Sequence, residues 1–319
     1  MTQSTKKPRR DVAQEITNRI ITAIEAGTPP WKQPWKNAFG NMRPLRNNGA
    51  PYTGVNVLIL WDRAGEMGFE NPRWMTFRQA LELGGHVRKG ERAVSVVYYG
   101  STTQTIEDKS GEEADQTIRF LKSYPVFNVG QIDDLPAHFY EHKGSDIVRT
   151  PPPSERTAFF EAIGAEIRHG GDRAFYRDGE DFIQMPPYGS FEDPERYFAT
   201  LAHEATHWSG GRRRLERLKF PMTEAERAYE ELIAEIGSAL LGAHLNLKPD
   251  HIDDHAAYVK SWLKALRGDK RYILKAAAAA QKACEFLLQR AHPSGAGDAV
   301  TAPVAADNAN EPAAPAYAA

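Results

Sequence analysis

The 319-residue chain has the composition of an ordinary globular protein, with 41% hydrophobic and 26% charged residues. No apolar run approaches the ~20 residues that a membrane helix needs. The basic N-terminus leads into an amphipathic segment and not into an apolar signal core, so we expect neither a membrane span nor secretion. The single cysteine, Cys284, cannot form an internal disulfide, and we expect a cytoplasmic protein.

The formal net charge of -2 is unevenly distributed. Residues 1–100 hold 15 Lys and Arg against 8 Asp and Glu, a net +7, and the remainder holds 25 against 34, a net -9. Trp31, Trp35, Trp61 and Trp74 also lie in the basic part. A basic, aromatic-rich region joined to an acidic one indicates two modules with different partners.

The N-terminal module mixes helical and strand patterns. Apolar residues recur on one helical face before Gly27, whereas the segment TPPWKQPWKN is too rich in proline for a helix and predicts an exposed loop. We expect a helix over 11–27, a short helix from Thr76 to Leu83, strands over 93–99 and 117–129, and a polar, acidic hairpin tip over 100–116.

A proline-rich segment, 136–153, predicts a linker between two domains. After it the pattern becomes mainly helical, around one hairpin marked by Asp178-Gly179. We expect a helix from Ser154 to His169, strands within 174–187, a helix from Asp193-Pro194 to Gly210, and helices over 223–246, 250–268 and 270–290. The predicted fold is α+β, with domains over 1–135 and 154–290 and a disordered Ala/Pro-rich tail over 291–319.

The segment His203-Glu204-Ala205-Thr206-His207 carries a metal-ligand spacing. Residues four apart share one helical face, so both imidazoles can reach one ion, and Glu204 can reach a water bound to that ion. Neutral imidazole suits zinc, for which manganese(II) is the alternative, and a catalytic zinc site adds a third protein ligand and keeps a fourth position open. The alternative interpretation is two histidines that share a helix face by chance.

The third ligand must come from elsewhere, and AYEELIAEIGSALL (228–241) is helical by pattern. Zinc peptidases of the thermolysin-like group take a Glu from a following helix as ligand, with a carboxylate one turn on that orients a liganding histidine. This segment resembles that arrangement, with Glu231 as ligand and Glu235 as the orienting carboxylate. Glu230 would point about 100° away from the face of Glu231 and Glu235. A ligand at Glu230 or Glu235, or two solvated surface charges, remain the alternatives.

Such a centre predicts amide hydrolysis in which Glu204 acts as general base. The strand over 182–185 is a candidate for binding an extended peptide by edge pairing.

The basic module combines cations that can follow phosphates with rings that can stack on bases, as in sequence-tolerant single-strand binding. Core tryptophans beneath an ordinary charged surface are the alternative. The DNA-binding candidates are Trp31, Lys32, Trp35, Lys36, Tyr52, Trp74, Arg78 and Lys89.

Several ordered motifs resemble ArdC-type antirestriction proteins. DVAQEITNRIITAIEAGTPPWKQPW, PYTGVNVLILW and WMTFRQALELGGHVRKGERAVSVVYYG resemble their N-terminal domain, which TraC-type conjugative primases share. DFIQMPP, AHEATHWSGGRRRLER and YEELIAEIGSALL resemble their zincin-like domain. The resemblance covers roughly residues 11–290, without the tail, and the acidic insert 107–115 has no place in it.

The resemblance implies an antirestriction protein of a conjugative plasmid or other mobile element that binds single-stranded DNA. Its peptidase domain would act on a protein that we do not identify, a host factor or a restriction enzyme. Two alternatives are a binding protein with a structural or vestigial zinc site, and an accessory to conjugative priming.

Overall fold

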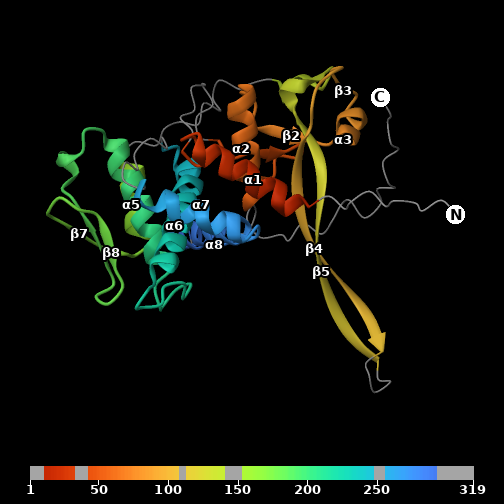
Figure 1. The fold of residues 1–319 in the computed structure, drawn as a ribbon. Coiled ribbons are helices and arrows are strands. Elements are labelled where there is room, and N and C mark those ends of the chain that lie inside the picture. Colours follow the sequence, from red (N-terminus) through yellow and green to blue (C-terminus); the bar gives the residue numbers. More distant parts are fainter. Residues whose placement is uncertain (1–10, 33–41, 108–112, 141–152, 248–255, 293–319) are drawn as a thin grey trace.

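The computed structural model describes residues 11–32, 42–107, 113–140, 153–247 and 256–292. It joins a sheet-bearing N-terminal part to a C-terminal part built of packed helices and one small sheet (Figure 1). The α+β prediction is therefore confirmed. The expectations for Trp35, Lys36 and the tail 293–319 lie outside the described residues.

The N-terminal part begins with the expected helix, which Asp11 caps by accepting a hydrogen bond from the backbone N–H of Gln14. Thr76 and Gln79 form a reciprocal capping box on the short helix that follows β2. A further helix, α2, had no counterpart in the prediction, because its nearly continuous apolar sequence lacks a clear period. The elements are α1 (Val12–Glu25), β1 (Leu45–Arg46), α2 (Val55–Met67), β2 (Arg73–Met75), α3 (Phe77–Glu82), β3 (His86–Val87), β4 (Val94–Glu107), β5 (Glu113–Asn128), η1 (Val129–Gln131), β6 (Ile132–Asp133) and η2 (Ala137–Phe139).

Strands β4 and β5 form a long antiparallel hairpin at the edge of a sheet with the order β1-β2-β5-β4. Their outer halves extend away from the body as a two-stranded ribbon (Figure 1). Both strands continue through most of the segment expected to be a hairpin tip, β4 as far as Glu107 and β5 from Glu113 onward. The edge of β4 is closed by Asn56, whose side chain accepts from the N–H of Val97 at 2.8 Å and donates to its carbonyl at 2.8 Å.

The C-terminal part differs from the prediction at its first helix, which was expected to run to His169. It ends at Ala162, because the chain turns at Gly164 with φ +76° and continues as a strand parallel to β9. The elements are α4 (Pro153–Ala162), β7 (Glu166–His169), β8 (Phe175–Arg177), β9 (Phe182–Met185), η3 (Tyr188–Ser190), α5 (Pro194–Ser209), α6 (Glu224–Leu245), α7 (Ala256–Gly268) and α8 (Tyr272–Ala291).

The predicted hairpin around Asp178-Gly179 is confirmed as β8 and β9. However, β9 is the middle strand of the order β7-β9-β8, so its backbone is paired on both sides. The expectation that residues 182–185 offer a free edge to a peptide is therefore wrong. Among the described strands, β7 and β8 form the two edges of this sheet, and β8 is the edge strand that contacts α5.

The two parts share one continuous hydrophobic core. Trp31 is 3% exposed and packs edge-on against Trp262 of α7, with 6.2 Å between the ring centroids. The Thr17 hydroxyl of α1 donates to the carbonyl of Lys270 at 2.8 Å, and Arg43 donates to the side-chain oxygen of Gln281 on α8. The N-terminal part therefore lies against α7 and α8.

Replacing Trp31 with alanine should lower the free energy of unfolding by about 3–5 kcal/mol, because the substitution leaves a large cavity between α1 and α7. Urea denaturation followed by circular dichroism measures the change. Tyr99→Ala is the control, since that ring is 58% exposed and should change stability by less than about 0.5 kcal/mol. Equal effects of the two substitutions would contradict the shared core.

Candidate metal centre

Helix α5 carries the two histidines and begins where the sequence predicts. Asp193 accepts from the N–H of Glu195 at 2.9 Å, and Pro194 occupies the first helical turn. From Tyr197 onward most residues of α5 are buried, so the elements packed around this helix fix its rotation. His203 and His207 therefore lie one turn apart on the side that faces α6, with their Nε2 atoms 3.1 Å apart.

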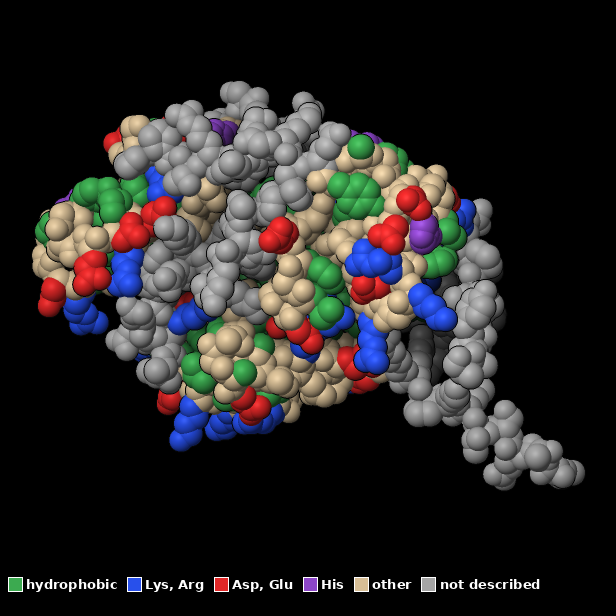
Figure 2. All heavy atoms as spheres, turned by 90° about the horizontal axis from the view of Figure 1, so that it is seen from above, with side chains coloured by type: hydrophobic (Ala, Val, Ile, Leu, Met, Phe, Trp, Pro, Cys, Tyr) green, Lys and Arg blue, Asp and Glu red, His purple; other side chains and the backbone are tan. Residues whose placement is uncertain are grey.

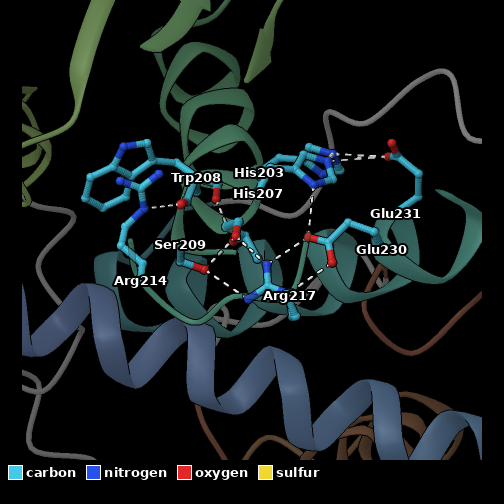
Figure 3. Close-up of polar contacts among 10 residues, drawn as sticks. His203, His207, Trp208, Ser209, Arg214, Arg217, Glu230 and Glu231 are labelled. Atoms are coloured by element: carbon cyan, nitrogen blue, oxygen red, sulfur yellow. Dashed lines mark hydrogen bonds and ion pairs between the residues drawn. The ribbon is translucent and has the colours of Figure 1, made fainter. Parts of the chain in front are cut away.

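Helix α6 supplies the carboxylate. Thr223 and Glu226 form a capping box at its start, and Asn246 ends it in the left-handed conformation. Gly237 allows α6 to approach α5 closely, because a Cβ at that position would lie 2.5 Å from Cγ2 of Thr206. This approach brings Glu231 opposite both histidines (Figure 3).

The three side chains present one compact set of ligand atoms. Oε2 of Glu231 lies 3.4 Å from Nε2 of His203 and 3.7 Å from Nε2 of His207. Tetrahedral zinc bonds of about 2.0–2.2 Å place neighbouring ligand atoms roughly 3.3–3.6 Å apart. The edges of this triangle, 3.1, 3.4 and 3.7 Å, therefore fit a single divalent ion.

The fourth candidate, Glu204, lies on α5 next to His203 and is 7% exposed. It is not one of the three residues whose ligand atoms cluster. Glu204 is therefore not placed in the ligand set, and its role as a proton acceptor stays a prediction.

The charges of the centre are strongly coupled. Burial alone would lower the pKa of His207, but its hydrogen bonds to Glu230 and Glu231 outweigh burial and raise that pKa to about 10. Burial would raise the pKa of Glu231, yet its contacts with His203 and His207 hold it well below its ordinary value. The carboxylates therefore favour positive charge at the imidazoles, which is also where a divalent ion would be held.

Glu230, to which the sequence assigned no orienting role, contacts a histidine of the ligand set, and the orienting role predicted for Glu235 stays a prediction. Oε1 of Glu230 lies 3.2 Å from Nδ1 of His207, and the side chain of Arg217 donates to both oxygens of Glu230, at 2.8 and 3.0 Å (Figure 3). Glu235, predicted for this role, is 1% exposed one turn beyond Glu231 on α6. The carboxylate hydrogen-bonded to His207 Nδ1 is that of Glu230, not of Glu235.

Sequence reasoning missed Arg217 because it lies in the run GRRRLER, whose charge suggests a solvated surface. In the structure, two of these arginines point into the protein. Arg214 pairs with Asp181 of the β8–β9 hairpin, and Arg217 pairs with Glu230. The spacing of three between them, close to one helical turn, is a weak signal that could have separated them from the exposed Arg212 and Arg213.

The predicted DNA-binding rings are not exposed. Trp31, Tyr52 and Trp74 are 3%, 2% and 2% exposed and belong to the main core, so the expectation that they offer free faces to bases is wrong. Their burial follows from close packing against α2, the sheet and α7. Among the described residues, the exposed rings of the N-terminal part are instead Phe77, Tyr98, Tyr99 and Tyr140.

The predicted cations lie nearer the surface. Arg78 and Lys89 are exposed, and Lys32 is half-buried. Arg78 pairs with Glu82 one turn along α3, at 2.8 Å. On the face seen from above, the described basic and acidic side chains are interspersed and form no single basic surface (Figure 2).

Two family models match the chain, the N-terminal domain of anti-restriction factor ArdC over residues 10–127 and a zincin-like metallopeptidase over residues 154–279. The crystal structure of the antirestriction ArdC protein from plasmid R388, in its metal-free form, is 47% identical with a TM-score of 0.76, covering 88% of this chain and 98% of that one. The chain belongs to the ArdC family of antirestriction proteins. The Mn(II)-bound structure of the R388 protein is also similar, at 47% identity and a TM-score of 0.75, covering 89% and 99%.

Two further relatives are similar to this ArdC-family chain. The uncharacterized protein y4eC of Sinorhizobium fredii is 36% identical over 90% of this chain and 94% of its own length. DNA primase TraC of Escherichia coli is 37% identical over 89% of this chain, which spans only 27% of the primase. The family and the site geometry together indicate divalent-metal binding. None of the described helices is both long and apolar enough to cross a bilayer.

Replacing Glu231 with glutamine should weaken binding of zinc and of manganese by at least ~100-fold, since loss of an orienting partner alone costs about 10–100-fold. Isothermal titration of metal-free protein measures both affinities. Glu224→Gln, an identical change at the exposed start of α6, should leave them unchanged. Retention of normal affinity in Glu231→Gln would remove this residue from the ligand set.

Proposed function

We propose that this ArdC-family chain is a metal-dependent peptidase of a mobile element that acts in antirestriction and binds single-stranded DNA. The observation that supports the enzymatic part best is the convergence of His203, His207 and Glu231, with Glu204 beside them on α5. Because three protein ligands leave a fourth position open, this set is typical of catalytic zinc and not of closed structural sites.

A divalent cation held by these three residues would supply Lewis acidity and lower the pKa of a bound water toward ~7. Glu204 would accept the proton of the attacking water and pass it to the leaving amine. The edge strand β8, which contacts α5, would hold an extended peptide by backbone pairing. The proposed reaction is hydrolysis of an amide bond in a host factor or a restriction enzyme.

Zinc is the proposed native metal, because two imidazoles and one carboxylate in a small triangle suit tetrahedral coordination. Manganese(II) is the alternative, since the R388 relative has a Mn(II)-bound structure. Elemental analysis of protein purified without added metal distinguishes the two.

Glu204→Gln should keep the affinity for metal within a few-fold of normal, because Glu204 is not a ligand, and should abolish peptide cleavage. Cleavage of casein is measured with and without single-stranded DNA, and metal content is measured on the same preparations. Glu192→Gln is the control, a matched change just before α5 whose pairing with Arg196 is peripheral. Undiminished cleavage by Glu204→Gln would exclude Glu204 as the base.

The same variant separates antirestriction from proteolysis. A plasmid carrying Glu204→Gln is transferred by conjugation into a restricting host, and surviving transconjugants are counted. Unchanged protection would show that antirestriction is a binding activity with a structural or vestigial metal site. A role as an accessory to conjugative priming is a second candidate, favoured by the similarity to TraC, and predicts altered primer synthesis in the recipient.

Single-stranded DNA is the proposed nucleic-acid partner, supported by the excess of basic residues in the first hundred positions and by the ArdC N-terminal family match. Since the predicted rings are buried, we propose that exposed rings stack on bases instead. Tyr98 and Tyr99 lie side by side on β4 at the root of the ribbon, 36% and 58% exposed, across from Lys122 and Leu121 of β5. Their alternation along the strand points the two rings to opposite faces.

The double variant Tyr98→Ala/Tyr99→Ala should weaken binding of oligo-dT by ~1–3 kcal/mol for each stack that is lost. Lys89→Gln should weaken it modestly and reduce the salt dependence by about one counterion. Fluorescence anisotropy over a salt series measures both effects. Tyr188→Ala, which removes a 43% exposed ring from the C-terminal part, is the control. If oligo-dT binding depends neither on salt nor on the two tyrosines, stacking on these rings is excluded.

A further inference from the structure

The loop between α5 and α6 holds two arginines that point into the protein. Arg214 and Arg217 have side chains only 7% and 13% exposed. Each donates to a backbone carbonyl of α5, Arg214 to Trp208 and Arg217 to Thr206. The two arginines differ in their carboxylate partners. Arg214 pairs with Asp181, away from the candidate metal ligands, whereas Arg217 pairs with Glu230, which contacts one of them.

All three guanidinium nitrogens of Arg217 donate hydrogen bonds. Its Nη2 and Nε donate to Oε1 and Oε2 of Glu230 at 2.8 and 3.0 Å, and Nη1 donates to the hydroxyl of Ser209 at 3.2 Å. Gly210 leaves the space for it, because a Cβ there would lie 2.7 Å from Nη2. Two parallel donors fix both the place and the plane of the Glu230 carboxylate.

The fixed carboxylate then contacts a candidate metal ligand. Glu230 is 5% exposed, and its Oε1 lies 3.2 Å from Nδ1 of His207. A neutral imidazole whose Nδ1–H donates to a carboxylate presents an unprotonated Nε2 to a metal ion, and its ring cannot rotate about χ2 without losing that bond. Nε2 of His207 is the atom that faces His203 and Glu231 (Figure 3).

We propose that Arg217 is a positioning residue of the metal centre, which acts on His207 through Glu230. Arg217 holds Glu230, and Glu230 holds the imidazole with Nε2 toward the ion. This inference rests on the metal-binding part of the proposed function. It also gives adjacent carboxylates on α6 different tasks: Glu231 is a ligand, and Glu230 orients a ligand.

Arg214 provides a matched comparison within the same loop. It is equally buried, donates to the same helix and makes an ion pair with Asp181, supported by a hydrogen bond to the Tyr176 hydroxyl at 2.7 Å. Those partners belong to the β8–β9 hairpin and are not among the three clustered ligands. Loss of Arg214 should therefore affect stability without changing the metal centre.

The test compares Arg217→Gln, Arg217→Lys and Arg214→Gln with the unaltered full-length chain. Zinc affinity is measured by competition with a chelating dye, and the Co(II)-substituted proteins are compared by their visible absorption spectra, which report coordination geometry. Urea denaturation of the metal-free proteins measures stability. We expect about 10- to 100-fold weaker zinc binding and an altered Co(II) spectrum in Arg217→Gln. Arg217→Lys should recover part of the affinity, since a single ammonium cannot make both bonds.

Arg214→Gln should lose stability but keep the zinc affinity and Co(II) spectrum of the unaltered chain. The positioning role is overturned if Arg217→Gln binds zinc normally with an unchanged spectrum, or if both glutamine variants lose affinity in proportion to their stability. Should Arg217→Gln fail to fold, an unchanged spectrum and affinity in the folded Arg217→Lys variant overturns it equally. Failure of the unaltered chain to bind zinc or Co(II) contradicts the proposed metal site itself.

Discussion

The candidate metal centre depends on the close approach of α5 and α6. Gly237 lies directly on Thr206, so the helices come nearer than a side chain at that position would permit. Glu231 lies between one and two turns before Gly237 on α6, and His203 and His207 flank Thr206 on α5. A larger residue at 237 would separate the helices and enlarge a ligand triangle whose edges are 3.1–3.7 Å. The geometry of the site is thus set by helix packing and not by the motif alone.

Charge balance is the second constraint on this region. Glu230 and Glu231 are adjacent and largely buried, and each would be costly to bury in its ionised form without a partner. Arg217 pairs with Glu230 through two charge-assisted hydrogen bonds, at 2.8 and 3.0 Å. Glu231 has instead the two imidazoles as partners, and a divalent ion would be held between these three side chains. The two neighbouring carboxylates thus have different partners, a guanidinium for Glu230 and the two imidazoles of the candidate metal site for Glu231.

Local signals in the sequence were sufficient for much of this fold. Caps such as Asp193 and Thr76, the Asp178-Gly179 turn and the spacing of His203 and His207 act within one turn or one hairpin, so they can be recognised without tertiary contacts. The extension of the first C-terminal helix failed because the strand at 166–169 forms only by pairing with β9. The roles of Glu230 and Arg217 were hidden for the same reason, since a charged residue reveals its partner only in three dimensions. The triangle including Glu231 was anticipated, but only with help from a resemblance.

Trp31 illustrates how an N-terminal residue supports the metal-bearing helix. Its ring packs on Trp262 of α7, and the indole N–H of Trp262 donates to the carbonyl of Ala228 at 2.6 Å. Ala228 lies on α6, three residues before Glu231. The Trp31 ring, for which the composition suggested DNA binding, is therefore part of a series of packed contacts that reaches α6 close to Glu231. If substitution of Trp31 weakened DNA binding, the cause would therefore be damage to this shared core and not the loss of a ring that stacks on a base. Tyr99 is 58% exposed, so its substitution does not disturb the core in this way. Only rings outside the core can test base stacking in this protein.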